Sequence, residues 1–67
     1  MIAITINGEP REFEAVVSVS RLLEEVGLAN KKIALERNGE IVPRSRFREE
    51  TVADGDRLEI VVAVGGG

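Results

Sequence analysis

The residues with the clearest chemical potential are three consecutive glycines, Gly65, Gly66 and Gly67, with which the 67-residue sequence ends. At average glycine usage, such a run at one given end arises by chance in about one chain in 3,000. Glycine is costly to order and has no Cβ, so we expect a mobile tail that is slender enough to enter a narrow channel of another protein. The α-carboxylate at its end has a pKa of about 3.5 and is ionised at pH 7.

An ionised carboxylate is a competent nucleophile toward the α-phosphate of a nucleotide held by Mg²⁺. Attack there gives a mixed anhydride, which a sulfur or amine nucleophile can open. The tail therefore suits a swinging acyl carrier whose reactive group is the carboxylate of Gly67. An ordinary frayed terminus or a leftover of cloning accounts for three glycines equally well. The tail alone leaves both interpretations open.

The rest of the composition argues against several classes of site. There is no histidine and no cysteine, which removes metal sites built on these residues, thiol nucleophiles and disulfides. The net charge of −3 and the presence of only two aromatic residues, Phe13 and Phe47, argue against a nucleic-acid partner. No apolar stretch approaches about 18 residues and no signal-peptide pattern follows Met1. We therefore expect a cytoplasmic protein without a membrane partner.

The length allows one small domain. A chain of this size buries only about 60% of its surface, which leaves little structure to enclose a cleft of about 300 Å³ or more. We therefore expect no self-contained enzyme. The predicted organisation is one domain over residues 1–64 and a separate tail over residues 65–67.

Apolar periodicity predicts the elements that position the tail. Alternation predicts strands over residues 2–7 and 11–15, joined at Asn7-Gly8, a dipeptide that favours tight hairpins, although Glu9-Pro10 could lengthen the loop. A helix is predicted over residues 17–27. Ser18 would cap its start, Gly27 would take the left-handed conformation after its end, and its buried face would consist of Val19, Leu22, Leu23 and Val26.

The second half of the chain predicts three more strands. Residues 33–37 and 41–42 flank a second hairpin turn at Asn38-Gly39, and Pro43 stops the short strand or confines it to an edge. Residues 44–50 are expected to form a charged loop or short helical turn pinned by Phe47. After a turn at residues 54–56, the last strand is predicted over residues 58–64.

These elements predict an α+β fold in which a mixed sheet of four to five strands packs one face on one helix. Because residues 60–64 are all apolar, the last strand is expected inside the sheet. If Ile60, Val62 and Val64 face the helix, Val61 and Ala63 point outward, or the reverse. We interpret Val61, Ala63 and Val64 as a partner-binding patch beside the tail. Isolated exposed apolar residues are an equally good interpretation.

Several charged residues could be docking, metal or acid-base groups, and none of them is a strong candidate for a functional site. Arg44, Arg46 and Arg48 could guide docking onto an acidic surface, although such loops are usually only solvated. Glu49-Glu50 and the carboxylates at residues 54 and 56 are not expected to form a metal or acid-base site. For Arg37 and Arg57 we expect no role beyond cross-strand charge pairing. The sequence predicts no metal site.

The sequence resembles the ThiS family of thiamin-biosynthesis sulfur carriers, which belongs to the ubiquitin-like β-grasp proteins. The resemblance spans essentially the whole chain. It rests on the predicted element order, on residues 35–44 (LERNGEIVPR), on residues 54–56 (DGD) and on residues 64–67 (VGGG). Many members carry a bulky aromatic residue, often Trp, where this chain has Phe47.

The resemblance implies that the chain is a protein-bound sulfur donor and not an enzyme. An E1-like adenylyltransferase would use ATP and Mg²⁺ to adenylate Gly67, and sulfur from a cysteine desulfurase and persulfide relay would convert it to a thiocarboxylate. Thiazole synthase would accept that sulfur, with Gly65 and Gly66 inside the partner's active site. The chain itself would bind no cofactor and would be a monomer when free.

Three alternatives stay open at this point. The same chemistry could serve molybdopterin or another sulfur-containing metabolite, because fold and tail are shared. The chain could instead be a ubiquitin-like modifier that forms isopeptide bonds to lysines. It could also be a β-grasp interaction domain whose tail is inert.

Overall fold

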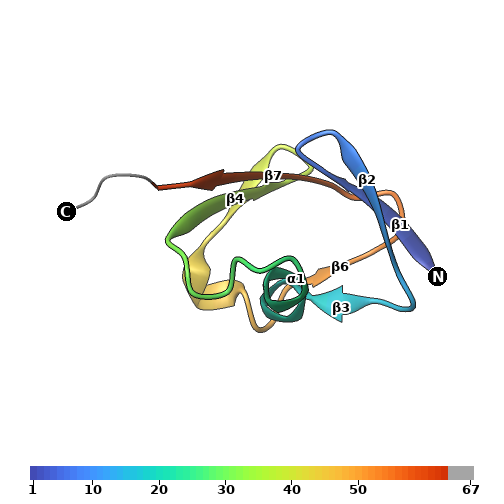
Figure 1. Cartoon of the computed structure of the whole chain (residues 1–67), viewed down its shortest axis with the longest axis horizontal. Helices are drawn as coiled ribbons and strands as arrows, with labels where there is room; N and C mark the ends of the chain where they lie inside the picture. The colour runs from blue at the N-terminus through green and yellow to red at the C-terminus, as the bar shows by residue number, and fades with distance from the viewer. Residues whose placement is uncertain (64–67) are drawn as a thin grey trace.

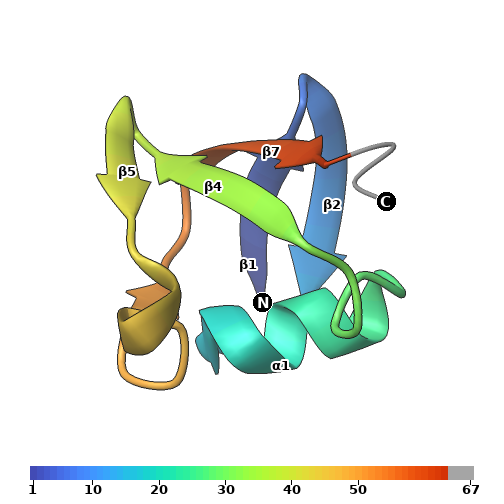
Figure 2. The same ribbon diagram turned by 90° about the vertical axis from the view of Figure 1, so that its left-hand side faces the viewer.

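The computed structural model describes residues 1–63, and in them a mixed sheet packs one face on one α-helix. The elements in chain order are β1 (Ile2–Ile6), β2 (Glu9–Phe13), β3 (Val17–Ser18), α1 (Val19–Glu25), β4 (Ile33–Arg37), β5 (Glu40–Val42), the 3₁₀ turn η1 (Arg44–Arg46), β6 (Thr51–Val52) and β7 (Arg57–Val62). The five-stranded sheet has the order β2-β1-β7-β4-β5. Helix α1 lies below this sheet (Figures 1 and 2). The predicted fold class is confirmed.

The hairpin of β1 and β2 is tighter than predicted. Asn7 and Gly8 have φ values of +52° and +84°, the left-handed conformation that a two-residue type I′ turn requires. Glu9 and Pro10 pair with β1 and do not lengthen the loop. Strand β2 therefore begins and ends two residues before the predicted range of 11–15. Proline is tolerated there because β2 is an edge strand of the sheet.

The predicted roles of Ser18 and Gly27 at the two ends of the helix are confirmed, but the helix is shorter than the predicted range of 17–27 because Val17 and Ser18 form β3. Val26, predicted on the buried face, follows the last helical residue and is half-buried. The Oγ of Ser18 accepts a hydrogen bond from the N–H of Arg21 at 3.1 Å. After the helix, Gly27 has a φ of +82°, and the N–H of Leu28 donates to the carbonyl of Leu23 at 2.8 Å, as in a Schellman motif. Within the helix, the buried face consists of Val19, Leu22 and Leu23.

The chain between β4 and β6 also follows the prediction. The turn Asn38-Gly39 has the same left-handed conformation as the first hairpin, and β5 is an edge strand that ends before Pro43. The 3₁₀ turn η1 follows, and Phe47 is buried beside it. The expected short helical turn pinned by an aromatic ring is confirmed.

A second, two-stranded ladder was not predicted. Val17 pairs with Val52 and Ser18 with Thr51 in an antiparallel arrangement. The N–H of Val19 also donates to the carbonyl of Glu50 at 2.9 Å. Strands of two residues are too short to show alternation, so periodicity could not reveal them. The ladder ties the start of α1 to the segment that follows η1.

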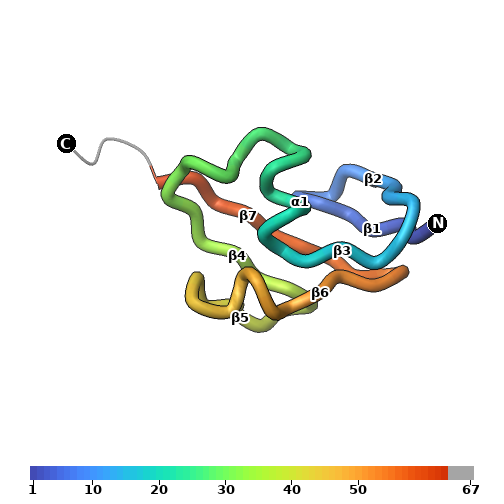
Figure 3. Tube along the Cα trace, turned by 90° about the horizontal axis from the view of Figure 1, so that it is seen from below, coloured from blue at the N-terminus to red at the C-terminus, as the bar shows by residue number. Residues whose placement is uncertain are grey.

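Strand β7 lies inside the sheet, as predicted, parallel to β1 and antiparallel to β4. It starts at Arg57 and ends at Val62, so it is shorter than the predicted range of 58–64. Seen from below, α1 lies in front of the central strands (Figure 3). The core between helix and sheet consists of Ile2, Ile4, Val19, Leu22, Leu23, Leu35, Val42, Phe47, Val52, Leu58 and Ile60.

Candidate functional site

The candidate site begins at the carboxyl end of β7, from which the chain leads to the predicted glycine tail. Leu58 and Ile60 are 1% and 6% exposed, so the core fixes this strand. The last described residue, Ala63, donates its N–H to the carbonyl of Lys32 at 2.9 Å. The main chain is therefore held by hydrogen bonds up to the residue four positions before Gly67.

Asn7 completes the hydrogen bonding of β7 on the side of β1. Strand β1 pairs with β7 only at Arg57 and Leu58. Beyond this point the Asn7 side chain takes the place of a strand: its Oδ1 accepts from the N–H of Ile60 at 2.7 Å, and its Nδ2 donates to the carbonyl of Ile60 at 3.0 Å. The residue that forms the hairpin turn thus also positions the strand that leads to the tail. This role of Asn7 has no signal in the sequence, because 53 positions separate the two residues.

The structure shows which residues of the last strand face outward. Val61 is 66% exposed and pairs with Ala34 of β4, and Ala63 is exposed as well. Val62 is 37% exposed, although it has the same orientation along the strand as the buried Ile60. The exposed positions are those expected for the partner-binding patch, whose role stays a prediction.

The remaining residues of the predicted site are Val64, Gly65, Gly66 and Gly67, and they lie outside the described residues. The predicted division of the chain after residue 64 falls there too. Their assignment as partner-binding residues and as the reactive end stays a prediction from sequence.

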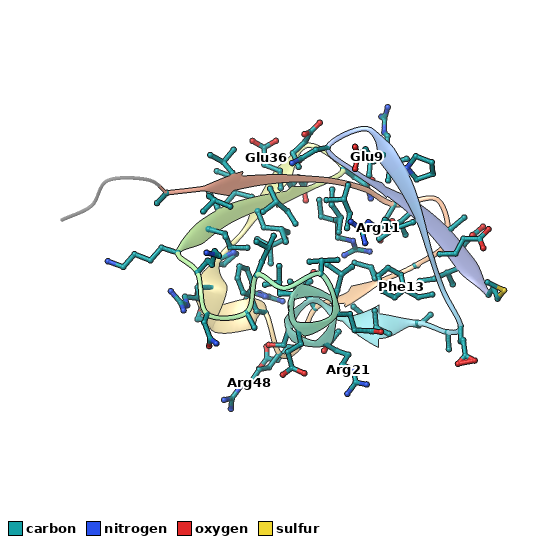
Figure 4. All side chains as sticks on the ribbon, viewed as in Figure 1. Glu9, Arg11, Phe13, Arg21, Glu36 and Arg48 are labelled. Atoms are coloured by element: carbon teal, nitrogen blue, oxygen red, sulfur yellow. The ribbon has the colours of Figure 1, made fainter. Side chains whose placement is uncertain are left out.

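The face of the sheet opposite α1 is covered by no other element of residues 1–63 (Figures 1 and 2). We call this surface the outer face and define it by the residues that alternate with the core positions of β4, β5 and β7. These residues are Ala34, Glu36, Ile41, Arg57, Glu59 and Val61, all of them exposed. In Figure 4, Glu36 lies on the side of the sheet that faces away from α1. The outer face reaches the end of β7 and therefore borders the start of the tail.

A buried carboxylate lies at the opposite end of β7. Asp56 is 8% exposed and accepts hydrogen bonds from Arg37 Nε at 2.9 Å, Asn38 Nδ2 at 3.0 Å and the Ala53 N–H at 2.8 Å. Burial raises the pKa of Asp56, but the hydrogen bonds from Ala53, Asn38 and Arg37 and the charge of Arg37 outweigh it, so the pKa lies below its ordinary value. The carboxylate is ionised at neutral pH.

Arg37 links this carboxylate to a second one. Its Nη1 lies 3.1 Å from Glu50 Oε1, and the hydrogen bond to Asp56 is the main reason why the pKa of Arg37 is raised. Arg37 thus has a role beyond the predicted cross-strand charge pairing, and that prediction is wrong, because its partners Asp56 and Glu50 lie outside the strands that pair with β4. The partners of Asp56 are side chains and main chain of the fold itself, so the network is structural.

The other charged candidates are not brought together into a site. Arg46 pairs with Glu50 at 3.2 Å, whereas Arg44 and Arg48 are exposed and form no ion pair within residues 1–63. Over the same residues, no group of three or more His, Cys, Asp or Glu side chains could hold a metal ion. No helix in the described part of the chain has the length and apolarity needed to cross a bilayer.

Comparisons with known proteins converge on one family. A sequence model described as "ThiS family" matches residues 4–67. The protein named Sulfur carrier protein ThiS from Bacillus subtilis is 42% identical over 50 residues, which cover 75% of this chain and 76% of that protein. A crystal structure of the thiamine biosynthesis protein ThiS from Geobacter metallireducens matches with a TM-score of 0.84 and 33% identity, and covers 98% of this chain and 100% of that one. The structural match confirms the predicted β-grasp fold.

A further relative is much longer than this chain. The protein named Thiazole synthase from Paramagnetospirillum magneticum is 52% identical over 64 residues, which cover 96% of this chain but 20% of that protein. A second protein of that name, from Magnetococcus marinus, has the same coverage. The chain thus spans about a fifth of the length of these two relatives.

Proposed function

The chain belongs to the ThiS family, and we propose that it is a sulfur carrier in thiamin biosynthesis whose reactive group is the carboxylate of Gly67. The observation that carries this proposal is the combination of a strand held in place up to Ala63 with a sequence that continues as Val64 and three glycines. The name Sulfur carrier protein ThiS of a relative that this chain matches over three quarters of its length supports it.

In the proposed reaction, an E1-like adenylyltransferase binds ATP and Mg²⁺, and the Gly67 carboxylate attacks the α-phosphate with loss of pyrophosphate. The terminal sulfur of a persulfide, which a cysteine desulfurase supplies through a relay, then attacks the acyl-adenylate and displaces AMP to give an acyl disulfide. A thiol reduces the S–S bond of this acyl disulfide, itself becomes part of a disulfide, and leaves the Gly67 thiocarboxylate. Thiazole synthase takes this sulfur while it builds the thiazole ring. The carrier is a co-substrate of these enzymes, binds no cofactor itself and is not an enzyme. The two relatives named Thiazole synthase support this choice of acceptor.

The short distance between domain and reactive group determines how a partner must approach. Four residues follow Ala63, and four extended residues span at most about 14 Å. An enzyme that acts on Gly67 must therefore contact the end of β7. Gly65 and Gly66 would lie in its channel, and Val61, Ala63 and Val64 would contact its surface. Docking of the domain raises the effective concentration of the tail at the active site.

Intact-mass spectrometry tests the proposed function directly. After incubation with the adenylyltransferase and MgATP we expect the mass of one added AMP. After addition of the desulfurase, cysteine and a thiol reductant we expect replacement of one oxygen by sulfur. Fragmentation should place both changes at Gly67. A chain that lacks Gly66 and Gly67 is the control and should stay unmodified. Modification elsewhere in the chain, or none, would overturn the proposal.

A further inference from the structure

Two carboxylates lie directly opposite one another at the centre of the outer face. Glu36 of β4 and Glu59 of β7 form a registered antiparallel pair, which places their Cβ atoms about 4.5–5.5 Å apart. Both are exposed, and neither takes part in an ion pair within residues 1–63. Like charges in this relation destabilise a sheet, so the fold alone gives no reason for their position.

Exposed apolar side chains flank the pair. Ile41 of β5 is registered opposite Glu36 and is 72% exposed, so it lies in the same row across the sheet. The next row toward the end of β7 contains Ala34 and Val61. The pair therefore lies beside apolar side chains that are exposed within the described part of the chain.

The cations of the same face lie at its two ends. Arg57 is two positions from Glu59 along β7, and Lys32, whose carbonyl holds Ala63, lies at the tail end. Neither is within ion-pair distance of Glu36 or Glu59. The centre of the face thus carries two carboxylates that have no ion-pair partner within residues 1–63.

This centre lies near the end of β7, which a protein that acts on Gly67 must contact under the proposed function. Glu59 precedes Ala63 by four residues, a separation of about 13 Å along a strand. A standard interface covers about 800 Å² per partner, which corresponds to a patch about 28 Å across. An enzyme that contacts the end of β7 on the outer face therefore covers the carboxylate pair as well.

We propose that the E1-like adenylyltransferase docks on the outer face and presents one arginine or lysine between Glu36 and Glu59, with apolar groups against Val61 and Ile41. This inference rests on the proposed function, because that function brings the enzyme to this end of the domain. A cation at this place relieves the repulsion between the Glu36 and Glu59 carboxylates and donates a charge-assisted hydrogen bond to each of them. A second copy of the chain fits poorly, because its own carboxylates would meet the same negative centre.

The test compares two double variants of the full chain that remove equal charge. Glu36→Gln with Glu59→Gln neutralises the pair, and Glu24→Gln with Glu49→Gln neutralises two exposed carboxylates outside the outer face. Affinity for the purified adenylyltransferase is measured by calorimetry at low and at physiological salt. We expect the first variant to bind about tenfold more weakly, with a smaller salt dependence, and the second to bind within about twofold of wild type.

Thermal unfolding of the same proteins separates lost recognition from lost structure. Removal of the repulsion should raise the melting temperature of the Glu36→Gln, Glu59→Gln variant by about 1–5 °C, so weaker binding cannot reflect a damaged fold. Equal affinities of the two variants, with a wild-type tail that is adenylated normally, would overturn the inference and leave the proposed function intact. A wild-type dimer that forms through the outer face would also overturn it. A wild-type chain that is never adenylated would instead overturn the proposed function, and the inference with it.

Discussion

At the scale of single residues, Asp56 shows how burial and charge are balanced in a domain with a small core. Its carboxylate is nearly out of contact with solvent and is held by three donors: Arg37 and Asn38 at the β4–β5 hairpin, and the N–H of Ala53 three residues before it. Hydrogen bonds to a buried charge stabilise a fold only when every donor and acceptor is matched. No buried side-chain nitrogen or oxygen of the described residues lacks a partner.

We predict that Asp56→Asn lowers the free energy of unfolding at pH 7 by about 2–3 kcal/mol, because the amide lacks the charge and one of the acceptors that the three donors require. The dependence of the free energy of unfolding on pH in the acid range should change too. The folded-state pKa of Asp56 lies below its ordinary value of 3.8, so its contribution is fully present above that value and is lost as the pH falls through the folded-state pKa. Denaturation by urea at a series of pH values between about 2 and 7 measures both effects.

The neighbouring carboxylate is the matched control. Asp54 Oδ1 accepts one hydrogen bond, from the exposed Ala3 N–H at 2.7 Å, so Asp54→Asn should cost less than half as much stability. In the Asp56→Asn protein the loss of stability between about pH 5 and pH 2 should be smaller than in wild type. If the wild-type and Asp56→Asn proteins lose the same free energy of unfolding as the pH falls, the Asp56 carboxylate is not the cause of that loss.

At the scale of elements, the strand that leads to the tail depends on a turn at the other end of the sequence. Asn7 gives the hairpin its left-handed conformation and also closes the open side of β7 at Ile60. We predict that Asn7→Gly keeps the turn, since glycine adopts a positive φ freely, but removes both hydrogen bonds and about 1–2 kcal/mol of stability. Amide hydrogen exchange should quicken most at Ile60.

The Val42 amide, in the β4–β5 hairpin, serves as the internal reference in the same exchange experiment, because it does not depend on Asn7. Protection factors at Ile60 and Val42 that fall by the same factor would indicate a global loss of stability instead of a local one. An unchanged rate at Ile60 would contradict the role assigned to the Asn7 side chain.

Elements with a local signal were predictable from the sequence. The two Asn-Gly turns, the Ser18 cap and Gly27 act on neighbouring residues, and each occupies the predicted position. The pairing of β7 with β1 and β4, the β3–β6 ladder and the Asn7 contact join distant segments, and no periodicity encodes them. In the candidate site, the outward orientation of Val61 required the register, whereas the glycine end was evident from composition alone.

At the scale of the whole molecule, the domain separates the groups that stabilise the fold from those that meet partners. The core and the Asp56 network lie between the sheet and α1 or at the start of β7. The outer face and the end of β7 carry exposed apolar and charged side chains that the fold does not use. Substitutions on the outer face should therefore change partner reactions with little effect on stability.

Val61→Asp tests whether the outer face contacts partners without stabilising the fold, and the same substitution at another exposed valine, Val16, is the control. Val61 is 66% exposed beside the predicted tail, whereas Val16 is 54% exposed in the segment before β3, away from the outer face. We expect the loop variant Val16→Asp to stay within about 0.5 kcal/mol of wild-type stability. Val61→Asp should lose about 1 kcal/mol, because aspartate is disfavoured in a strand and adds a charge near Glu59, and it should stay folded. We expect Val61→Asp alone to lower kcat/KM for adenylation of the carrier about tenfold or more, through a higher KM, because a desolvated charge opposes docking. If both variants are adenylated as efficiently as wild type, the adenylyltransferase recognises the tail without contacting the outer face around Val61.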